Sequence, residues 1–261
     1  MVKVYTIASG KGGTGKTTVS VNLGTILSQL GKETFLMDAD IGMANVGLIL
    51  GLQDAPVTLH EILAGKGTLN EAIYEGPAGL KVIPSGLSLQ GFQQADPERI
   101  RDVMADIIKR CEFLIIDAPA GISKDGVVPL AVADEVILVV NPELSSIVDA
   151  LKTKILTEVV GGQVLGSIIN RVDQDKIDVI TKKMEKVLGV KVIGIIPEDS
   201  NVRRASAAKT PIVLKFPTSP ASLAFKRIAS ELIGVAYKEE KSAIPREGFI
   251  DRFSKALFKR K

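Results

Sequence analysis

The chain has 261 residues, of which 46% are hydrophobic and 24% charged, and its formal net charge is +3. This composition is typical of a soluble globular protein with one substantial core. The single cysteine, Cys111, excludes an internal disulfide and a paired-cysteine iron–sulfur site, and it indicates a reducing compartment. Because no uninterrupted apolar run approaches 18 residues, we expect no membrane-spanning segment.

The first predicted elements are an apolar strand over residues 2–9 and a helix over residues 17–30, joined by the glycine-rich sequence GKGGTGKT. This spacing of glycines before Lys16 and Thr17 is typical of a phosphate-binding loop. Glycines let backbone N–H groups converge on phosphate oxygens at the positive end of the helix dipole. We expect Lys16 to contact the β and γ oxygens and Thr17 to ligate Mg²⁺. The predicted nucleoside triphosphate site comprises Gly10, Lys11, Gly12, Gly13, Thr14, Gly15, Lys16, Thr17 and Thr18.

The same glycines also satisfy the dinucleotide-binding pattern G-x-G-x-x-G, and Asp38 lies where that fold places a ribose-binding acid. A dinucleotide site does not need the Lys16-Thr17 pair. A second strand that ends in an acid, residues 113–117 with Asp117, also favours the triphosphate interpretation.

The next predicted strand, residues 34–38, ends in Asp38, with Asp40 two residues later. Because side chains alternate along a strand, both carboxylates could face the same γ-phosphate and metal region. His60 lies in an apparent short helix, and as the only histidine it has no partner for a metal site or a catalytic triad. We expect its role to be structural.

A strand over residues 80–84 and a helix over residues 96–110 precede the apolar strand 113–117, which ends in Asp117. An acid at this strand tip, after a phosphate loop, suits a role in holding Mg²⁺ directly or through water. Thr17, Asp40 and Asp117 are therefore the predicted metal ligands.

Three further strands, 135–141, 163–170 and 191–196, alternate with helices over 145–160, 176–188 and 220–233. Asp96-Pro97 and Ser219-Pro220 are predicted helix starts, and glycines 31, 161, 189 and 234 are predicted helix stops. Continuous apolar strands separated by helices indicate an α/β fold: a doubly wound, mostly parallel sheet covered by helices on both faces. Ligands should bind at the carboxyl ends of its strands.

The identity of the base is open from chemistry alone. Asn170 begins the sequence N-R-V-D, which is similar to the guanine-reading motif N-K-x-D, with Asp173 as the acid. A side-chain amide can bond either purine, so Asn170 does not decide between adenine and guanine.

The C-terminal segment has a different composition from the rest of the chain. Residues 238–261 carry a net charge of +4, whereas residues 1–237 carry −1. We predict a nucleotide-binding domain over 1–237, a flexible linker over 238–247 and an amphipathic helix over 248–261. Its apolar face comprises Phe249, Ile250, Phe253 and Leu257, and its basic face Arg252, Lys255 and Lys259.

A basic helix of this kind can lie in a layer of anionic lipid headgroups, with its rings buried and its cations at the surface. A helix packed on the domain and a nucleic-acid-binding tail are the alternatives. The phenylalanines on one face, with lysine and arginine on the other, favour the lipid surface.

The loop K-G-G-x-G-K-T resembles that of the deviant Walker A ATPases. Within that group, the segment FLMDADIGMANVGLILG, residues 35–51, resembles the MinD cell-division ATPases, and the resemblance as a whole extends over residues 1–237. The resemblance implies ATP and Mg²⁺ as cofactors, with Asn170, Arg171, Pro197, Glu198 and Asp199 around adenine. It implies that Lys11 acts in trans in an ATP-bound homodimer and that Asp40 orients the attacking water. It also implies two switch segments that respond to the γ-phosphate. The first contains Asp38, and the second is DAPAG, residues 117–121, in which the N–H of Gly121 approaches the γ-phosphate.

The resemblance also implies slow ATP hydrolysis, catalysed by Lys11, Lys16 and Asp40, and a MinC-like or MinE-like partner. The expected localisation is cytoplasmic, with reversible attachment to the inner face of the cell membrane and a role in division-site placement. A flagellar or other placement regulator, a ParA-type DNA-partitioning ATPase and a scaffold without turnover are the alternatives.

Overall fold

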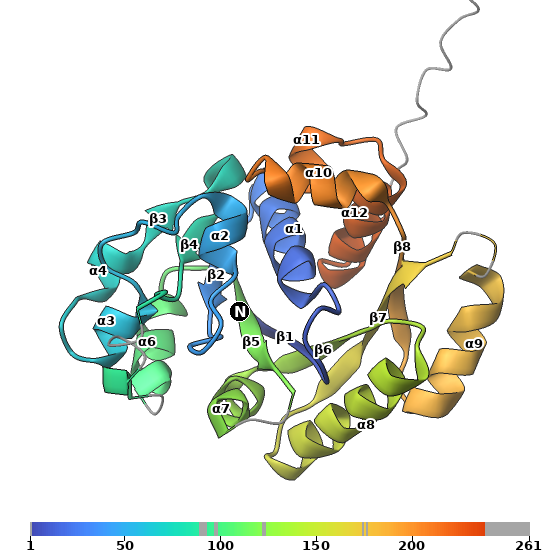
Figure 1. Ribbon diagram of the computed structural model, residues 1–261, viewed down its shortest axis with the longest axis horizontal. Helices are drawn as coiled ribbons and strands as arrows, with labels where there is room; N and C mark the ends of the chain where they lie inside the picture. The colour runs from blue at the N-terminus through green and yellow to red at the C-terminus, as the bar shows by residue number, and fades with distance from the viewer. Residues whose placement is uncertain are drawn as a thin grey trace, which may run out of the picture.

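The computed structural model describes residues 2–237 except 89–92, 97–98, 122–123, 174 and 176. The predicted linker and amphipathic helix, residues 238–261, lie outside the described residues. The described chain forms one sheet with helices on both faces, which confirms the predicted α/β class (Figure 1). No helix within the described ranges is both long and apolar enough to cross a bilayer.

The sheet is formed by β1 (Lys3–Ser9), β2 (Thr34–Asp38), β3 (Tyr74–Glu75), β4 (Lys81–Ile83), β5 (Phe113–Ala120), β6 (Glu135–Val140), β7 (Val164–Val172) and β8 (Val192–Pro197). Their order across the sheet is β3-β4-β2-β5-β1-β6-β7-β8. All neighbouring strands are parallel except β3 and β4. Because β5 lies between β1 and β2, its Asp117 pairs in register with Ile7 on one side and Asp38 on the other.

The helices are α1 (Lys16–Gln29), α2 (Val46–Leu50), α3 (Leu59–Leu63), α4 (Leu69–Ala72), α6 (Ile100–Ile107), α7 (Lys124–Val132), α8 (Leu144–Val159), α9 (Ile177–Leu188), α10 (Ser200–Ala207), α11 (Ile212–Lys215) and α12 (Pro220–Leu232). Helices α1, α10, α11 and α12 cover one face, and α7, α8 and α9 cover the other (Figure 1). Helices α3 and α6 extend the second layer over β2.

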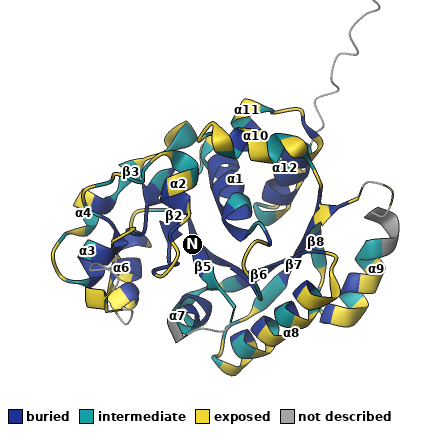
Figure 2. Cartoon of the chain, viewed as in Figure 1, coloured by how far each residue is buried: buried dark blue, intermediate teal, exposed yellow. Residues whose placement is uncertain are grey.

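Both faces of the sheet are buried, as Figure 2 shows by the dark central strands. Along β1, Tyr5 and Ile7 pack in the core beneath α1 and α12, whereas Val4 and Ala8 pack on the opposite side. Alternate residues therefore enter different cores, which is why these strands are apolar at nearly every position. Polar side chains are displaced to the strand ends, where the site forms.

Each of the seven strands predicted from the sequence is present, with small shifts at its ends. The strand predicted to end at Asp117 continues to Ala120, because Ala120 pairs with Ser9 beyond an irregularity in β1. Asp117 is therefore inside β5 and not at its tip. The short antiparallel edge strand β3 was not predicted; two residues carry too little periodicity to detect.

The helix predicted over residues 96–110 is shorter, since α6 begins at Ile100 with Arg99 as its N-cap. The predicted helix start at Asp96-Pro97 falls on residues 97–98, which lie outside the described residues; the Asp96 carbonyl accepts from Arg99 N at 3.1 Å. The Ser219 cap is confirmed, because its hydroxyl accepts from Ser222 N and Pro220 opens α12. Glycines 31, 161, 189 and 234 all have positive φ at the predicted helix stops.

Candidate functional site

The loop between β1 and α1 needs glycine for two physical reasons. Gly15, the N-cap of α1, has φ of 93°, and a Cβ there would lie 2.3 Å from Asn170 Nδ2. A Cβ on Gly10 would lie 2.1 Å from the backbone carbon of Asp149. No side chain of the described residues caps α1, and its first turn carries no acid. The loop thus presents backbone N–H groups at a positive helix end, which suits an anion.

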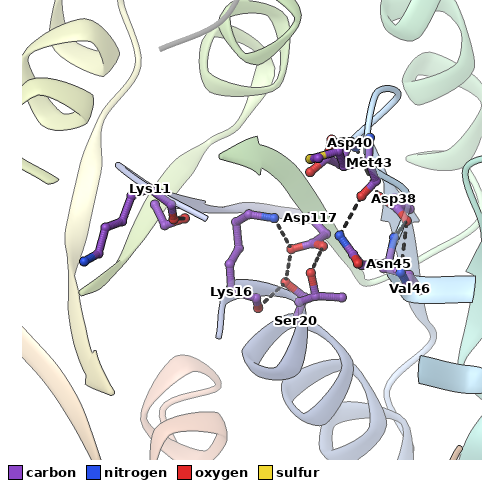
Figure 3. A network of polar contacts seen from close by, with 11 residues as sticks. Lys11, Lys16, Ser20, Asp38, Asp40, Met43, Asn45, Val46 and Asp117 are labelled. Atoms are coloured by element: carbon purple, nitrogen blue, oxygen red, sulfur yellow. Dashed lines mark hydrogen bonds and ion pairs between the residues drawn. The ribbon is translucent and has the colours of Figure 1, made fainter. Parts of the chain in front are cut away.

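Asp117 is the centre of a buried polar network (Figure 3). Its Oδ1 accepts from Lys16 Nζ at 3.2 Å and from Ser20 Oγ at 2.8 Å, and its Oδ2 accepts from Thr17 Oγ1 at 2.7 Å. Lys16 is only 6% exposed and Asp117 is fully buried. Removing Lys16 or Asp117 alone would leave the other buried charge unpaired, so this network fixes the start of α1 against β5.

Asp38 and Asp40 differ in their surroundings, contrary to the expectation that both face the phosphates. Asp38 is fully buried, and its carboxylate accepts from the backbone N–H groups of Asp40, Asn45 and Val46. Burial, and then the charge of Asp117, raise the pKa of Asp38 to about 7. Asp40 lies beyond the end of β2, lines the phosphate pocket and accepts from Met43 N at 3.0 Å. Asp38 therefore shapes the segment that presents Asp40.

Lys11 lines the phosphate pocket together with Lys16, but its ammonium is turned away from Lys16 (Figure 3). Its Nζ lies 2.8 Å from Glu143 Oε2 and 3.0 Å from Ser145 Oγ, at the start of α8. Figure 3 shows its side chain directed away from Lys16. The hydrogen bond from Lys11 lowers the pKa of the exposed Glu143 carboxyl. Although Lys11 belongs to the loop, its ammonium is held at Glu143 and Ser145, at the start of α8.

The predicted second switch, DAPAG, is partly strand. Asp117 to Ala120 belong to β5, and Gly121 follows with φ of 78°. The Gly121 N–H donates to Ser9 O at 2.9 Å, so it is not directed at a phosphate here. An approach of this N–H to a γ-phosphate requires that bond to break.

Two pockets meet at the loop. One, of about 350 Å³, is lined by the glycine-rich loop together with Asp40, Met43 and Asn45. The other, of about 250 Å³, lies between the ends of β7 and β8 and is lined by Asn170, Pro197, Glu198, Asp199 and Phe225, among others. Gly15, Thr18 and Arg171 line both. Phosphates in the first pocket and a base in the second would lie on a continuous path.

The residues predicted around the base are brought together, but the side chains of two of them, Asn170 and Asp199, already make hydrogen bonds to the backbone. Asn170 donates its amide to Thr14 O at 2.7 Å, and the Asp199 carboxylate accepts from Asn201 N and Ala221 N. Arg171 has a backbone φ of 58°, in the left-handed region, and its Nε lies 4.0 Å from Glu198 Oε2. Asp173 is exposed and is not part of this pocket lining, so the guanine-motif interpretation of N-R-V-D loses its acid.

The oxygen donors near the loop fit Mg²⁺. Thr17 and Asp117 supply a hydroxyl and a carboxylate, the hard ligands that Mg²⁺ prefers. No cluster of three or more histidine, cysteine or acidic side chains able to hold a metal occurs in the part of the chain that the structure describes. A metal here would consequently depend on phosphate oxygens and water for its other ligands, as is usual for Mg²⁺.

Sequence reasoning missed Ser20 and Glu143. Ser20 could have been found, because it is three and four residues after Thr17 and Lys16 on the same helix face. Glu143 has no local signal; only the fold brings α8 to the loop. Cys111 is half-buried, and burial raises its thiol pKa to about 11, which disfavours a reactive thiolate at this position.

These features define a P-loop nucleotide-binding protein with a second lysine in the loop. A dinucleotide-binding fold is excluded because its first two strands are neighbours, whereas β5 separates β1 from β2 here. Residues 5–212 match the model of the CobQ/CobB/MinD/ParA nucleotide binding domain. The chain belongs to this family of MinD/ParA-type ATPases.

Several relatives cover nearly the whole chain. An uncharacterized ATP-binding protein of Methanocaldococcus jannaschii is 48% identical over 100% of this chain and 98% of its own length. The antiactivator FleN of Pseudomonas aeruginosa is 34% identical over 88% of this chain and 86% of its own length.

Solved structures agree with this assignment. The cell division ATPase MinD of Pyrococcus furiosus is 34% identical, with a TM-score of 0.85 over 90% of this chain and 100% of that one. MinD of Pyrococcus horikoshii, in complex with Mg-ADP, has 34% identity and a TM-score of 0.83 over 89% of this chain and 96% of that one. A MinC:MinD complex of Aquifex aeolicus matches with 32% identity and a TM-score of 0.81, over 91% of this chain and 98% of that one.

Proposed function

We propose that this chain is a Mg²⁺-dependent ATPase that dimerises with ATP bound, attaches reversibly to a membrane through residues 248–261, and helps to place a division site. The observation that carries the proposal is the separation of the two loop lysines. Lys16 lies inside the phosphate pocket, and Lys11 is turned outward to Glu143. Lys11 lines the same pocket, but its ammonium is not directed to its own phosphate site and could serve the nucleotide of a second copy once the ion pair with Glu143 breaks.

In the proposed mechanism, Lys16 exchanges part of its contact with Asp117 for the β and γ oxygens of ATP. Mg²⁺, held by Thr17 and through water by Asp117, would neutralise phosphoryl charge when bound. Asp40 positions the attacking water, and Lys11 of a second copy completes the positive field. Because this arrangement needs two chains, we expect slow turnover by the isolated protein.

Membrane attachment would follow from dimerisation. One amphipathic segment gains about 1 kcal/mol for each basic residue at an anionic surface and roughly 1.5 to 3 for each buried phenylalanine, less the loss of chain entropy. Two segments in one dimer gain effective concentration, which raises avidity by about 10² to 10⁴. ATP would thereby control attachment, provided that hydrolysis dissolves the dimer.

The names of the relatives support a cellular role. The Pyrococcus proteins are a cell division ATPase and a septum site-determining protein, and the Aquifex complex supports a MinC-like partner. A placement regulator outside cell division is the second candidate, favoured by the similarity to the antiactivator FleN. Both candidates use the same nucleotide site.

Co-sedimentation with anionic liposomes tests the proposal. The full chain and a variant lacking residues 248–261 are spun with ATP, ADP or a slowly hydrolysed analogue, and their oligomeric size is measured in parallel. We expect ATP-dependent dimers in both and ATP-dependent pelleting of the full chain alone. Undiminished pelleting of the truncated chain would refute the membrane role, and salt-sensitive retention on DNA instead would favour a partitioning ATPase.

The nucleotide is tested separately. We expect ATP to displace a fluorescent ADP derivative more effectively than GTP, because the acid of the guanine motif is outside the base pocket. A preference for GTP would reverse the base assignment while leaving the phosphate site intact.

A further inference from the structure

His60, the only histidine of the chain, links two segments that border the site. Its ring is 1% exposed, and Nε2 lies 2.9 Å from the carbonyl oxygen of Ile41. A carbonyl can only accept, so Nε2 carries the proton and donates. Ile41 directly follows Asp40, which lines the phosphate pocket.

The helix that carries His60 is held to the sheet at its first turn. Helix α3 begins at a capping box formed by Thr58 and Glu61, and Leu59 N donates to Pro84 O at 2.9 Å beyond the end of β4. Gly86 lies directly against the ring, because a Cβ there would be 2.5 Å from His60 Nδ1. The backbone of His60 is therefore held to the sheet, whereas the ring makes its hydrogen bond to Ile41, because the buried Nδ1 has no partner among the described residues.

The segment after Asp40 and the His60 ring border the same open pocket. This pocket has a volume of about 390 Å³ and is lined by residues 41–45, His60 and residues 86–88. Ile41 is nevertheless buried in the core, and its N–H donates to Ala39 O at 3.0 Å. The segment is also held by hydrogen bonds to Asp38 inside, from Met43 N to Asp40, and, at the Ile41 carbonyl next to Asp40, to His60.

We propose that His60 is a positioning residue for hydrolysis: by holding the Ile41 carbonyl, it sets the orientation of Asp40 toward the attacking water. This inference rests on the proposed function, in which Asp40 orients that water. His60 touches neither nucleotide nor water in this role. It acts through the backbone between Ile41 and Asp40.

Three variants of the full-length chain test the inference by single-turnover ATP hydrolysis and steady-state kcat and KM. His60→Phe keeps a ring without a donor, and we expect kcat to fall about three- to tenfold with KM within about twofold. His60→Gln restores an N–H donor and should recover most of kcat. Gly86→Ala, whose Cβ would meet His60 Nδ1 at 2.5 Å and the Thr58 hydroxyl at 2.8 Å, displaces the ring together with the cap of α3 and should lower kcat at least as much as His60→Phe. Equal kcat in the Phe and Gln variants would overturn the inference.

Asp40→Ala separates this inference from the proposed function. If Asp40→Ala keeps wild-type turnover, the proposed role of the site fails. If Asp40→Ala is inactive while His60→Phe turns over normally, only the role of His60 fails.

The single imidazole also gives a measurement that needs no variant. In ¹⁵N-histidine-labelled wild-type protein without a polyhistidine tag, we expect the Nε2–H tautomer and a shift of its signal when a slowly hydrolysed ATP analogue replaces ADP. An Nδ1–H tautomer, or identical spectra in both nucleotides, would overturn the proposal.

Discussion

Lys11 Nζ lies 2.8 Å from Glu143 Oε2, so the loop is tied to the first turn of α8 in the same chain. Gly10 reaches the same helix by packing against the backbone of Asp149. If Lys11 serves the nucleotide of a second copy, this ion pair has to break first. The pair therefore competes with the proposed dimer.

Replacing Glu143 with Gln should favour dimerisation. The substitution removes the charge that holds Lys11, and because the pair is exposed we expect less than a tenfold gain in the ATP-dependent dimer. Sedimentation velocity with a slowly hydrolysed analogue measures this gain.

Glu158→Gln is the matched control, since it removes another exposed pair, with Lys154, on the same helix. We expect Glu158→Gln to leave the equilibrium constant of ATP-dependent dimerisation unchanged. A weaker dimer in Glu143→Gln would show that the contact helps assembly instead of opposing it.

Asp40→Ala should separate binding from hydrolysis. The methyl side chain cannot orient water, so phosphate release should fall by about 10²-fold or more, while nucleotide still binds through Lys16 and the loop. The protein should then remain on anionic liposomes in ATP for longer than the wild type. Lys16→Ala is the contrasting variant and should lose nucleotide-dependent pelleting altogether. Normal hydrolysis by Asp40→Ala would remove its assigned role.

Gly15→Ala and Gly12→Ala should differ sharply in stability. At Gly15, φ is 93° and a Cβ would meet Asn170 Nδ2 at 2.3 Å, so we expect a loss of about 2 kcal/mol or more in the free energy of unfolding. At Gly12 a Cβ meets no atom within 4 Å, and the loss should stay within about 1 kcal/mol. Urea unfolding of the two variants provides the comparison, and equal losses would contradict the role of close packing at Gly15.

The buried carboxyl of Asp38 predicts a pH dependence of stability. In the folded chain its pKa is about 7, whereas in the unfolded chain it is near 4, so between these values the folded state holds more protons. The contribution of Asp38 to stability is therefore complete below about pH 4 and is lost as pH rises through 7. Relative to Asp38→Asn, the wild type should lose about 2 kcal/mol between pH 5.5 and pH 8.5.

Calorimetric or urea unfolding of both proteins across this range tests the dependence on Asp38. Asp106→Asn, at an exposed acid paired with Lys109, controls for general charge effects. Parallel stability curves for the wild type and Asp38→Asn would contradict the raised pKa.

Much of the site was predictable because it is local in sequence. The strand, the glycine-rich loop and the helix follow one another, so Lys16 and Thr17 are placed by a few backbone angles. Asp117 was predicted as a strand acid, and the parallel sheet brings it to the loop. The continuous apolar strands likewise predicted a sheet buried on both faces, which the structure confirms.

The directions of side chains were not predictable in this way. Asp38 and Asp40 are two residues apart on what sequence suggested was one strand end, yet one is turned inward and the other lines the pocket. The chain leaves β2 at Asp38, and backbone N–H groups from Asn45 and Val46 return to its carboxylate. Such contacts depend on the path of the loop between Asp38 and Val46, which the hydrophobic periodicity of the sequence does not describe.

By itself, then, the sequence determined the phosphate loop, the strand acid and the alternation of strands and helices, because each depends on neighbours within a few residues. Only the tertiary structure decided that Lys11 pairs with Glu143 and that His60 holds Ile41. These partners lie far apart along the chain. Packing of whole elements, and no local rule, sets the distance between them.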